Sequence, residues 1–205
     1  MPRQINHDQR RTVIAEAVGR LVVAGGLEAV SMRQVAAAAG ISLGQVQHYF
    51  ATKDELLRYA LGAASGRTYD RYIERATHAS VSEEDVEPRQ LVHTMLVERL
   101  PLDDDDDGAR VDAHIGFAFL ARAMSEPELA KALRKRHESD EYALAELLRR
   151  GQREGSVRLD LDPMRAARTL LAVVDGLTAH VLVGHHTAWE AEQAFEHHLD
   201  DLFGA

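Results

Sequence analysis

The stretch of residues 41–57, "ISLGQVQHYFATKDELL", contains two residue choices that oppose helix stability. Gly44 lies inside a very short predicted helix, where glycine costs about 1 kcal/mol relative to alanine. Lys53 stands at the start of the next predicted helix, where a cation opposes the helix dipole by about 0.3–1 kcal/mol. An external anionic surface explains both residues. Glycine lets the backbone approach closely, and free helix amides together with an ammonium group bind a phosphate.

Short, sharply bounded helices are predicted around this stretch. Ser31, Ser42 and Thr52 each precede a helical pattern, and each is followed three residues later by glutamine or glutamate, the pattern of a capping box. Two short helices joined by a tight turn at residues 40–42 form a helix-turn-helix, whose second helix enters the major groove of DNA. Glutamine can pair with adenine there, and leucine can contact a thymine methyl group. Glutamines are also ordinary surface residues, but the turn and the caps favour a role in recognising DNA bases.

The segment "GISLGQVQHYFATKDEL", residues 40–56, resembles the signature of the TetR family of bacterial transcriptional regulators. The resemblance covers about residues 8–60 and implies a DNA-binding domain at residues 1–55. One departure is Gln47, which stands where the family usually has tyrosine. By resemblance, the phosphate contacts are Ser31, Arg33, His48, Tyr49 and Lys53, and the base readers are Leu43, Gln45 and Gln47. Ser42, as the cap of the recognition helix, and Gly44 complete the predicted DNA-binding set.

The charge distribution agrees with a DNA partner, although the chain of 205 residues carries a net charge of −9. Residues 1–53 hold six basic and three acidic residues, so this part carries +3 and the remainder −12. A small cationic head on an acidic body is therefore expected. The absence of cysteine excludes disulfides and thiolate zinc sites and fits a cytoplasmic location. No membrane partner is expected, because the chain lacks a long apolar run and a signal peptide.

Helical periodicity dominates the rest of the chain, and no alternating strand pattern is convincing. The fold class is therefore predicted as all-α, with about nine to ten helices. The run of residues 103–107, five aspartates, is expected to be a solvated loop. Residues 56–205 are expected to form a ligand-binding and dimerisation domain. The helices predicted beyond the head span residues 53–73, 89–99, 109–124, 127–136, 138–153, 163–184 and 188–203.

The last two predicted helices indicate a homodimer. The segment of residues 167–183, "ARTLLAVVDGLTAHVLV", is apolar on two faces, so one face can meet its own core and the other a partner. Two such helices from each of two chains would build a four-helix interface. A monomer with an internal helix pair is the alternative. The predicted dimer contacts are Val173, Gly176, Leu177, His180, Phe195, His198 and Leu202.

A ligand pocket is expected among the middle helices. Taken alone, each predicted lining residue favours a plain core position, and the sequence does not separate the two roles. The segments "LPLDDDDD" and "VVDGLTAHVLV" resemble regulators of choline and betaine operons. This resemblance does not assign a ligand. The predicted lining consists of Tyr69, Tyr72, Met95, His114, Phe117, Leu120, Met124 and Val174.

The histidines do not predict a metal site, and no cofactor is predicted. His185–His186 and His197–His198 are adjacent pairs, and neighbours in a helix point about 100° apart, so neither pair easily chelates one ion. His114 and His180 lie on apolar stripes, as core histidines often do. There is no E-x-x-H or H-E-x-x-H motif. The aspartate run lacks the spaced ligands of a calcium loop.

Together these patterns predict a homodimeric, ligand-responsive transcriptional regulator and not an enzyme. We expect a repressor that binds double-stranded DNA at a palindromic operator and is released by a small-molecule inducer. The alternative is a helical small-molecule-binding protein or enzyme whose head does not bind DNA; an adaptor acting through the acidic body is a third reading. The head discriminates between them, since an enzyme has no need for Gly44, Gln45 and Lys53 in this arrangement.

Overall fold

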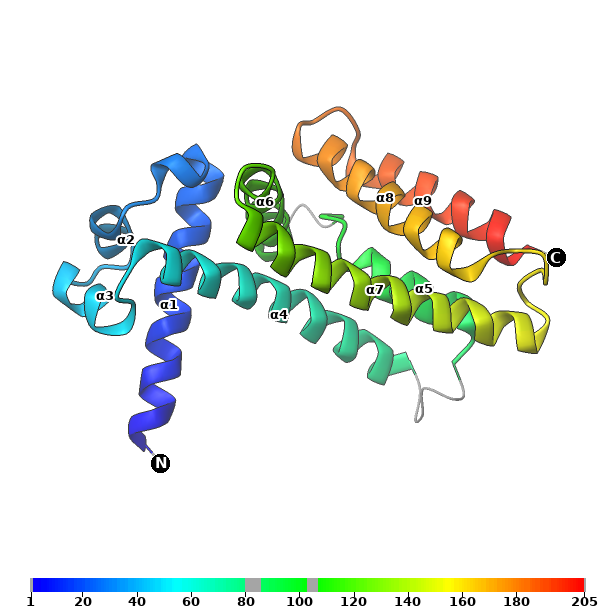
Figure 1. Cartoon of the computed structure of the whole chain (residues 1–205), viewed down its shortest axis with the longest axis horizontal. Coiled ribbons are helices and arrows are strands. Elements are labelled where there is room, and N and C mark those ends of the chain that lie inside the picture. Colours follow the sequence, from blue (N-terminus) through cyan, green and yellow to red (C-terminus); the bar gives the residue numbers. More distant parts are fainter. Residues whose placement is uncertain (1, 80–85, 103–106, 205) are drawn as a thin grey trace.

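The computed structural model describes residues 2–79, 86–102 and 107–204, and its regular structure within these ranges is helical without any strand (Figure 1). The all-α prediction is confirmed. The first part comprises α1 (Pro2–Gly25), the short 3-10 helix η1 (Leu27–Ala29), α2 (Met32–Ala38), α3 (Leu43–Tyr49) and α4 (Lys53–Ala79). The second part comprises α5 (Pro88–Val97), α6 (Asp107–Ala123), α7 (Pro127–Glu154), α8 (Pro163–Leu182) and α9 (Ala188–Phe203).

The helices form a small head and a larger body, which α4 joins (Figure 1). Helices α1, α2 and α3 gather around the start of α4, and α4 then runs along the body. In the body, α7 contacts α5, α6 and α8, and α9 packs on α5 and α8. Helix α6 lies between the two parts and contacts α1, α4 and α7. None of the described helices combines the length and apolar character that crossing a membrane requires.

The turn between α2 and α3 follows the predicted helix-turn-helix. Gly40 has a φ of +66°, a left-handed conformation that suits glycine and ends α2. Ser42 then caps α3 in a complete capping box. Its Oγ accepts from the backbone N–H of Gln45 at 3.2 Å, and Gln45 Oε1 accepts from the backbone N–H of Ser42 at 3.0 Å.

The other two predicted boxes are only half formed. Ser31 Oγ accepts from the backbone N–H of Gln34, but it also donates to Gln34 Oε1 at 2.6 Å in place of the backbone contact. Thr52 Oγ1 accepts from the backbone N–H of Glu55, whose carboxylate accepts from the N–H of Ala51 instead. The helix starts are confirmed, because one cap bond is enough to satisfy the first turn.

Two apolar cores hold the chain, and the first one crosses from the head into α6. Ile115 and Phe119 of α6 are fully buried among head residues such as Phe50 and Leu56. Helices α1 and α6 approach closely at Gly19. A Cβ atom there would lie 2.6 Å from Cγ1 of Val111. The predicted boundary after residue 55 stays a prediction, and this core shows that the two parts share apolar contacts.

Two helix predictions are wrong. Helix α7 is continuous over Pro127–Glu154 where separate helices at residues 127–136 and 138–153 were expected. No glycine or proline interrupts it near His137, so the ladder of backbone hydrogen bonds simply continues. Helix α4 extends to Ala79, beyond the expected end at residue 73. Of the aspartate run, residues 103–106 lie outside the described residues, and α6 begins at Asp107.

One face of α8 is buried in its own chain and the opposite face is exposed, so burial of the second face by a partner stays a prediction; one predicted dimer contact is wrong. Val174 is buried within the chain, and Gly176 and His180 are exposed on the opposite face. Phe195 of α9 is fully buried, and its ring stacks on His93 with centroids 5.8 Å apart. Phe195 therefore packs in its own chain and is not available to a partner. Leu177, His198, Leu202 and Val173 are half-buried.

We expect Gly19→Ala to lower the free energy of unfolding by about 1–3 kcal/mol, the usual cost of overpacking. The nearest atom belongs to Val111, whose β-branched side chain has little rotamer freedom in a helix. The matched control is Gly66→Ala in α4, where a Cβ meets nothing within 4 Å. The free energy of unfolding of this control variant should rise by up to about 1 kcal/mol, because alanine is a better helix former than glycine. Urea denaturation measures both; equal stability of the two variants would contradict a close α1–α6 contact.

Candidate DNA interface and ligand cavity

Helix α3 presents most of its predicted DNA-binding residues on one outward face. Val46 is its buried anchor, whereas Leu43 and Tyr49 are half-buried against the head core. The exposed residues of this face are Ser42, Gly44, Gln45, Gln47 and His48. The structure therefore brings these predicted residues together at the end of the head that is farthest from α9 (Figure 1).

The fold itself does not require a glycine at position 44. A Cβ atom there would meet nothing closer than Ser42 Oγ at 4.0 Å, and φ at Gly44 is not positive. Within the chain, alanine would therefore be the more stable choice at this position. The described fold thus gives no intramolecular reason for glycine here, and close approach of a DNA backbone stays a prediction.

The two glutamines of α3 differ in what their side chains can do. Gln45 Oε1 accepts from Ser42 in the capping box, and a bidentate pair with adenine needs this oxygen together with the NH₂ group. Gln47 is exposed and makes no side-chain hydrogen bond to any described residue. Gln47 is thus better placed than Gln45 to read a base without loss of a cap.

Lys53 lies at the first position of α4, half-buried, with its Nζ 3.4 Å from the backbone oxygen of Leu27. An ammonium group has three donors, and this contact uses one of them. At the end of α3, His48 and Tyr49 form an edge-to-face ring pair with centroids 5.2 Å apart. Arg33 is exposed on α2, and Ser31 caps that helix. Their phosphate-binding roles remain predictions.

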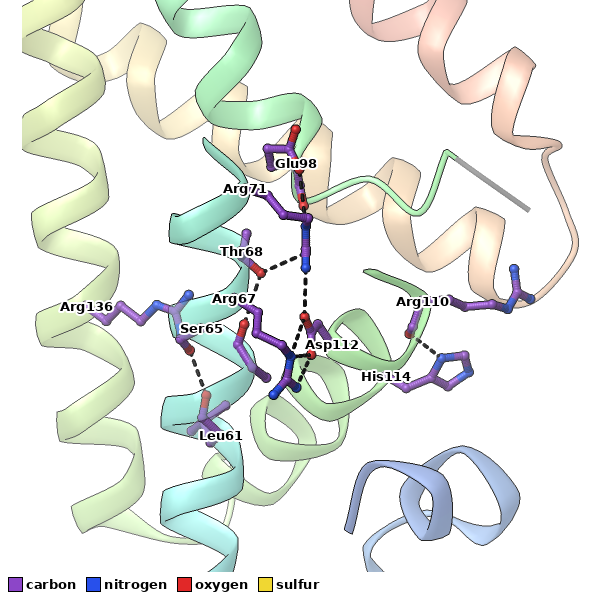
Figure 2. A network of polar contacts seen from close by, with 11 residues as sticks. Leu61, Ser65, Arg67, Thr68, Arg71, Glu98, Arg110, Asp112, His114 and Arg136 are labelled. Carbon is purple, nitrogen blue, oxygen red and sulfur yellow. Dashed lines mark hydrogen bonds and ion pairs between the residues drawn. The ribbon is translucent and has the colours of Figure 1, made fainter. Parts of the chain in front are cut away.

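Helix α4 is joined to the body by a network of ion pairs that the sequence reading did not foresee (Figure 2). Arg67, Arg71 and Arg75 are spaced four residues apart, so they lie on one face of α4. Arg71 Nη1 lies 3.1 Å from Asp112 Oδ2, and its Nε lies 3.2 Å from Glu98 Oε2. Arg67 also binds Asp112, and Arg75 Nε lies 2.5 Å from Glu98 Oε1. The spacing of the arginines was the available signal.

Both acids of this network are almost completely buried. The side chain of Glu98, just after α5, is 3% exposed, and that of Asp112 in α6 is 4% exposed. Removing a carboxylate from water costs several kcal/mol unless charged partners compensate. The arginines supply this compensation, so the network ties α4 to α5 and α6 in one defined arrangement.

A cavity of about 130 Å³ adjoins the network. Helices α4, α6, α7 and α8 supply most of its walls, and charged groups are frequent among its residues. Arg71, Glu98 and Asp112 belong both to its lining and to the ion network. Other lining residues are Thr68, Arg99, Gly116, Phe117, Leu120, Arg136, His137, Asp140, Asp175 and Thr178.

Two charges in this cavity have no ion-pair partner among the described residues. Burial raises the pKa of Asp175 above the usual carboxyl value, although the nearby Arg99 and His137 oppose the shift. Burial also lowers the pKa of Arg136, and the positive charge of Arg99 adds to this effect. Arg99 itself is paired, with Nη2 2.6 Å from Asp140 Oδ2. Arg136 does donate a hydrogen bond to Ser65 Oγ. The cavity thus holds one carboxyl group and one guanidinium group without an ion-pair partner among the described residues, and a ligand could supply one.

Only two of the eight predicted pocket residues, Phe117 and Leu120, line this cavity. Val174 is fully buried in the body core, and Met95 packs against that core. Met124 is 83% exposed. Tyr69 is exposed and its ring lies 6.1 Å from that of the half-buried Tyr72, and His114 Nδ1 is 2.8 Å from the backbone oxygen of Arg110. The predicted lining consisted mainly of apolar and aromatic residues, so the prediction missed the charged residues that line the cavity.

A helix-turn-helix with an outward recognition helix, on a helical body that holds a cavity, defines a DNA-binding regulator. Residues 14–60 match the family described as "Bacterial regulatory proteins, tetR family", and residues 88–204 match "BetI-type transcriptional repressor, C-terminal". The chain belongs to the TetR family of transcriptional regulators, which is a family of regulators and not of enzymes.

Individual relatives agree with this assignment. The chain is 31% identical to the HTH-type transcriptional regulator PksA of Bacillus subtilis, over 89% of this chain and 83% of that protein. A transcriptional regulator from Rhodococcus sp. Rha1 shares 27% identity at a TM-score of 0.76, over 94% of this chain and 95% of that one. A regulator from Saccharomonospora viridis, solved in complex with choline, shares the fold at 22% identity and a TM-score of 0.80, over 94% and 96% of the chains.

We expect Asp175→Asn to be more stable than the wild type at neutral pH. Because burial raises the folded-state pKa of Asp175, the folded chain loses stability as the pH rises from the ordinary carboxyl range through the raised value. Asparagine carries no charge and avoids this loss. Melting temperatures between about pH 4 and pH 8 should show an advantage of the variant that grows with pH.

The matched control is Asp201→Asn, at an exposed position of α9, which should follow the wild type at each pH. A variant at position 175 that is less stable than the wild type at neutral pH would contradict this account, since it would mean that the native carboxylate is ionised and favourably paired.

Proposed function

We propose that this protein is a homodimeric repressor that binds a palindromic operator through α3 and leaves it when a small molecule occupies the cavity. The observation that carries the proposal is the course of α4. It begins at Lys53, directly after α3, and continues to the ion network that forms part of the cavity wall. One continuous helix therefore connects the end of α3 with the cavity.

The dimer is supported by the outer faces of α8 and α9. Gly176 is exposed in the middle of α8, and Val173 is only half-buried on the same face. Val183 is 77% exposed and Trp189 is 67% exposed, near the turn between these helices. Large exposed apolar residues are typical of surfaces that contact a partner. A two-fold dimer would hold two α3 helices about one DNA turn apart, roughly 34–36 Å.

The ligand we propose is a small cation or zwitterion. Its positive group would pair with the carboxylate of Asp175, and an oxygen at its other end would accept from Arg136. Either contact would relieve the cost of an unpaired buried charge. The choline complex of the Saccharomonospora regulator supports a cationic ligand for this fold. Phe117 adds one aromatic ring to the lining, which can contribute a cation–π contact.

Induction would act through the ion network. Arg71 and Asp112 face the cavity and at the same time hold α4 in place, so a ligand that competes for either group alters the balance of contacts on α4. A tilt of α4 would change the separation of the two α3 helices in the dimer. A coupling free energy of about 1–3 kcal/mol is enough for a 5- to 150-fold change in operator affinity.

The DNA-binding part is tested by salt titrations with duplexes that flank the coding region and with scrambled duplexes. Lys53→Ala should weaken binding to both, and the slope of log affinity against log salt should fall by about two per dimer. Gln47→Ala should keep the slope and cost about 1–3 kcal/mol per half-site on the operator alone. Lys131→Ala, an exposed lysine of α7, is the matched control. A wild-type slope for Lys53→Ala would remove lysine 53 from the phosphate contacts.

The coupling is tested by measuring choline affinity with and without operator DNA. We expect operator to lower the affinity by about 5- to 150-fold in the wild type. Arg67 does not line the cavity, and Arg67→Gln removes a partner of Asp112 that holds α4, so it should reduce this ratio. Arg168→Gln, which breaks an exposed pair with Glu141, is the control. Equal affinities with and without operator would exclude coupling, because linkage is reciprocal.

A further inference from the structure

The end of α8 brings three histidines together in a way that their sequence positions do not suggest. His185 and His186 lie in the turn after α8. The angle of about 100° between neighbours in a helix, which argued against chelation, therefore does not apply to them. Gly184 has a φ of +72° and turns the chain back. The backbone N–H groups of His185 and His186 then both donate to the oxygen of His180, at 2.8 Å and 3.3 Å. The backbone itself thus holds the three residues at one place.

The three imidazole rings contact one another. Ring centroids of His180 lie 5.0 Å from those of both His185 and His186, and the latter two are 4.6 Å apart. One ring nitrogen from each residue can be chosen so that all three nitrogens lie within 4.8 Å of one another. Among the described residues, no other group of three or more potential metal ligands comes this close.

The chemistry of this cluster suits a metal ion. Zinc binds histidine nitrogen at about 2.0–2.1 Å, which places the nitrogens of a tetrahedral site about 3.3–3.4 Å apart. His180 and His185 are exposed, so modest side-chain rotations can close the remaining gap. None of the three side chains forms an ion pair with a described acid, which leaves the rings available for coordination.

A carboxylate stands close to the cluster. Glu190, in the first turn of α9, accepts from the backbone N–H and the hydroxyl of Thr187 at 2.8 Å and 2.9 Å. These hydrogen bonds hold the pKa of Glu190 below its usual range, and the nearby His186 and His185 add to the effect. A carboxylate near ligating histidines commonly supports a metal site as an outer partner.

We propose that His180, His185 and His186 form a binding site for a borderline divalent transition-metal ion, represented by Zn²⁺ or Ni²⁺. Imidazole is a preferred ligand of both ions. Three protein ligands leave at least one coordination position open, as in sites that exchange their fourth ligand. A bound ion would link the last turn of α8 to the segment that leads into α9. The site lies apart from α3 and uses none of the cavity residues. His180 is also a predicted dimer contact, but metal binding is no part of the proposed function.

The test is calorimetric titration of the metal-free protein with Zn²⁺ and, separately, with Ni²⁺. Wild type should bind one ion per chain at this site. His180→Ala and His185→Ala should each lower the affinity by more than about tenfold, since loss of even an outer partner costs 10- to 100-fold. His197→Ala, an exposed histidine of α9, is the matched control and should bind like wild type. Unchanged affinity in the first two variants, or an equal loss in all three, would overturn the proposal.

A second measurement guards against misfolding. The melting temperature of metal-free His185→Ala should equal that of wild type, because the replaced side chain is exposed and, unlike His180, is not a predicted dimer contact. Added Zn²⁺ should then raise the melting temperature of wild type and His197→Ala but not of His185→Ala. A rise of equal size in His185→Ala would also overturn the site. Neither measurement uses DNA or an inducer, so failure of the repressor proposal leaves both results interpretable.

Discussion

The arrangement of this protein depends on two buried carboxylates, those of Glu98 and Asp112, and on the face of α4 that neutralises them. Each acid is stable in its position only while arginines of α4 remain opposite it, because an unpaired buried charge is strongly destabilising. Arg71 contacts both acids and so ties the end of α5 to α6 through a single side chain. Ion pairs of this kind require specific distances and directions, so they define the position of α4 more narrowly than apolar contacts alone.

The head and the body use different forces at their common boundary. Apolar packing joins α1 and α4 to α6 through Ile115 and Phe119, and the ion network joins α4 to the same helix farther along. Near the head, Arg122 of α6 adds an ion pair with Asp54 at 2.9 Å. Helix α6 therefore contacts α4 at both of its ends. The cavity wall and the start of α4 are thus connected through one helix pair, α4 and α6.

Local signals made much of the fold predictable. The helix-turn-helix follows from its caps and Gly40. Helices α8 and α9 begin where Asp162 and Thr187 cap them, since such caps act on the next few residues only. What depends on distant residues was not predictable. The spacing of the arginines on α4 can be read directly, but nothing in it selects their two partners from 33 acidic residues. In the same way, the apolar stripe around Phe195 indicates that this residue is buried, but it does not indicate whether its own chain or a partner chain covers it.

The close contact at Gly19 has a consequence for the exchange of parts between regulators of this family. Residues 1–55 do not form a surface that is complete in itself, because α1 packs on Val111 and Ile115 of α6. In this chain, even a Cβ atom at Gly19 would lie 2.6 Å from Val111. A hybrid that joins this head to another body would place this tightly packed part of α1 against foreign side chains. To keep the packing of α1, a hybrid should carry either the inner face of α6 along with the head, or only the outward residues of α3.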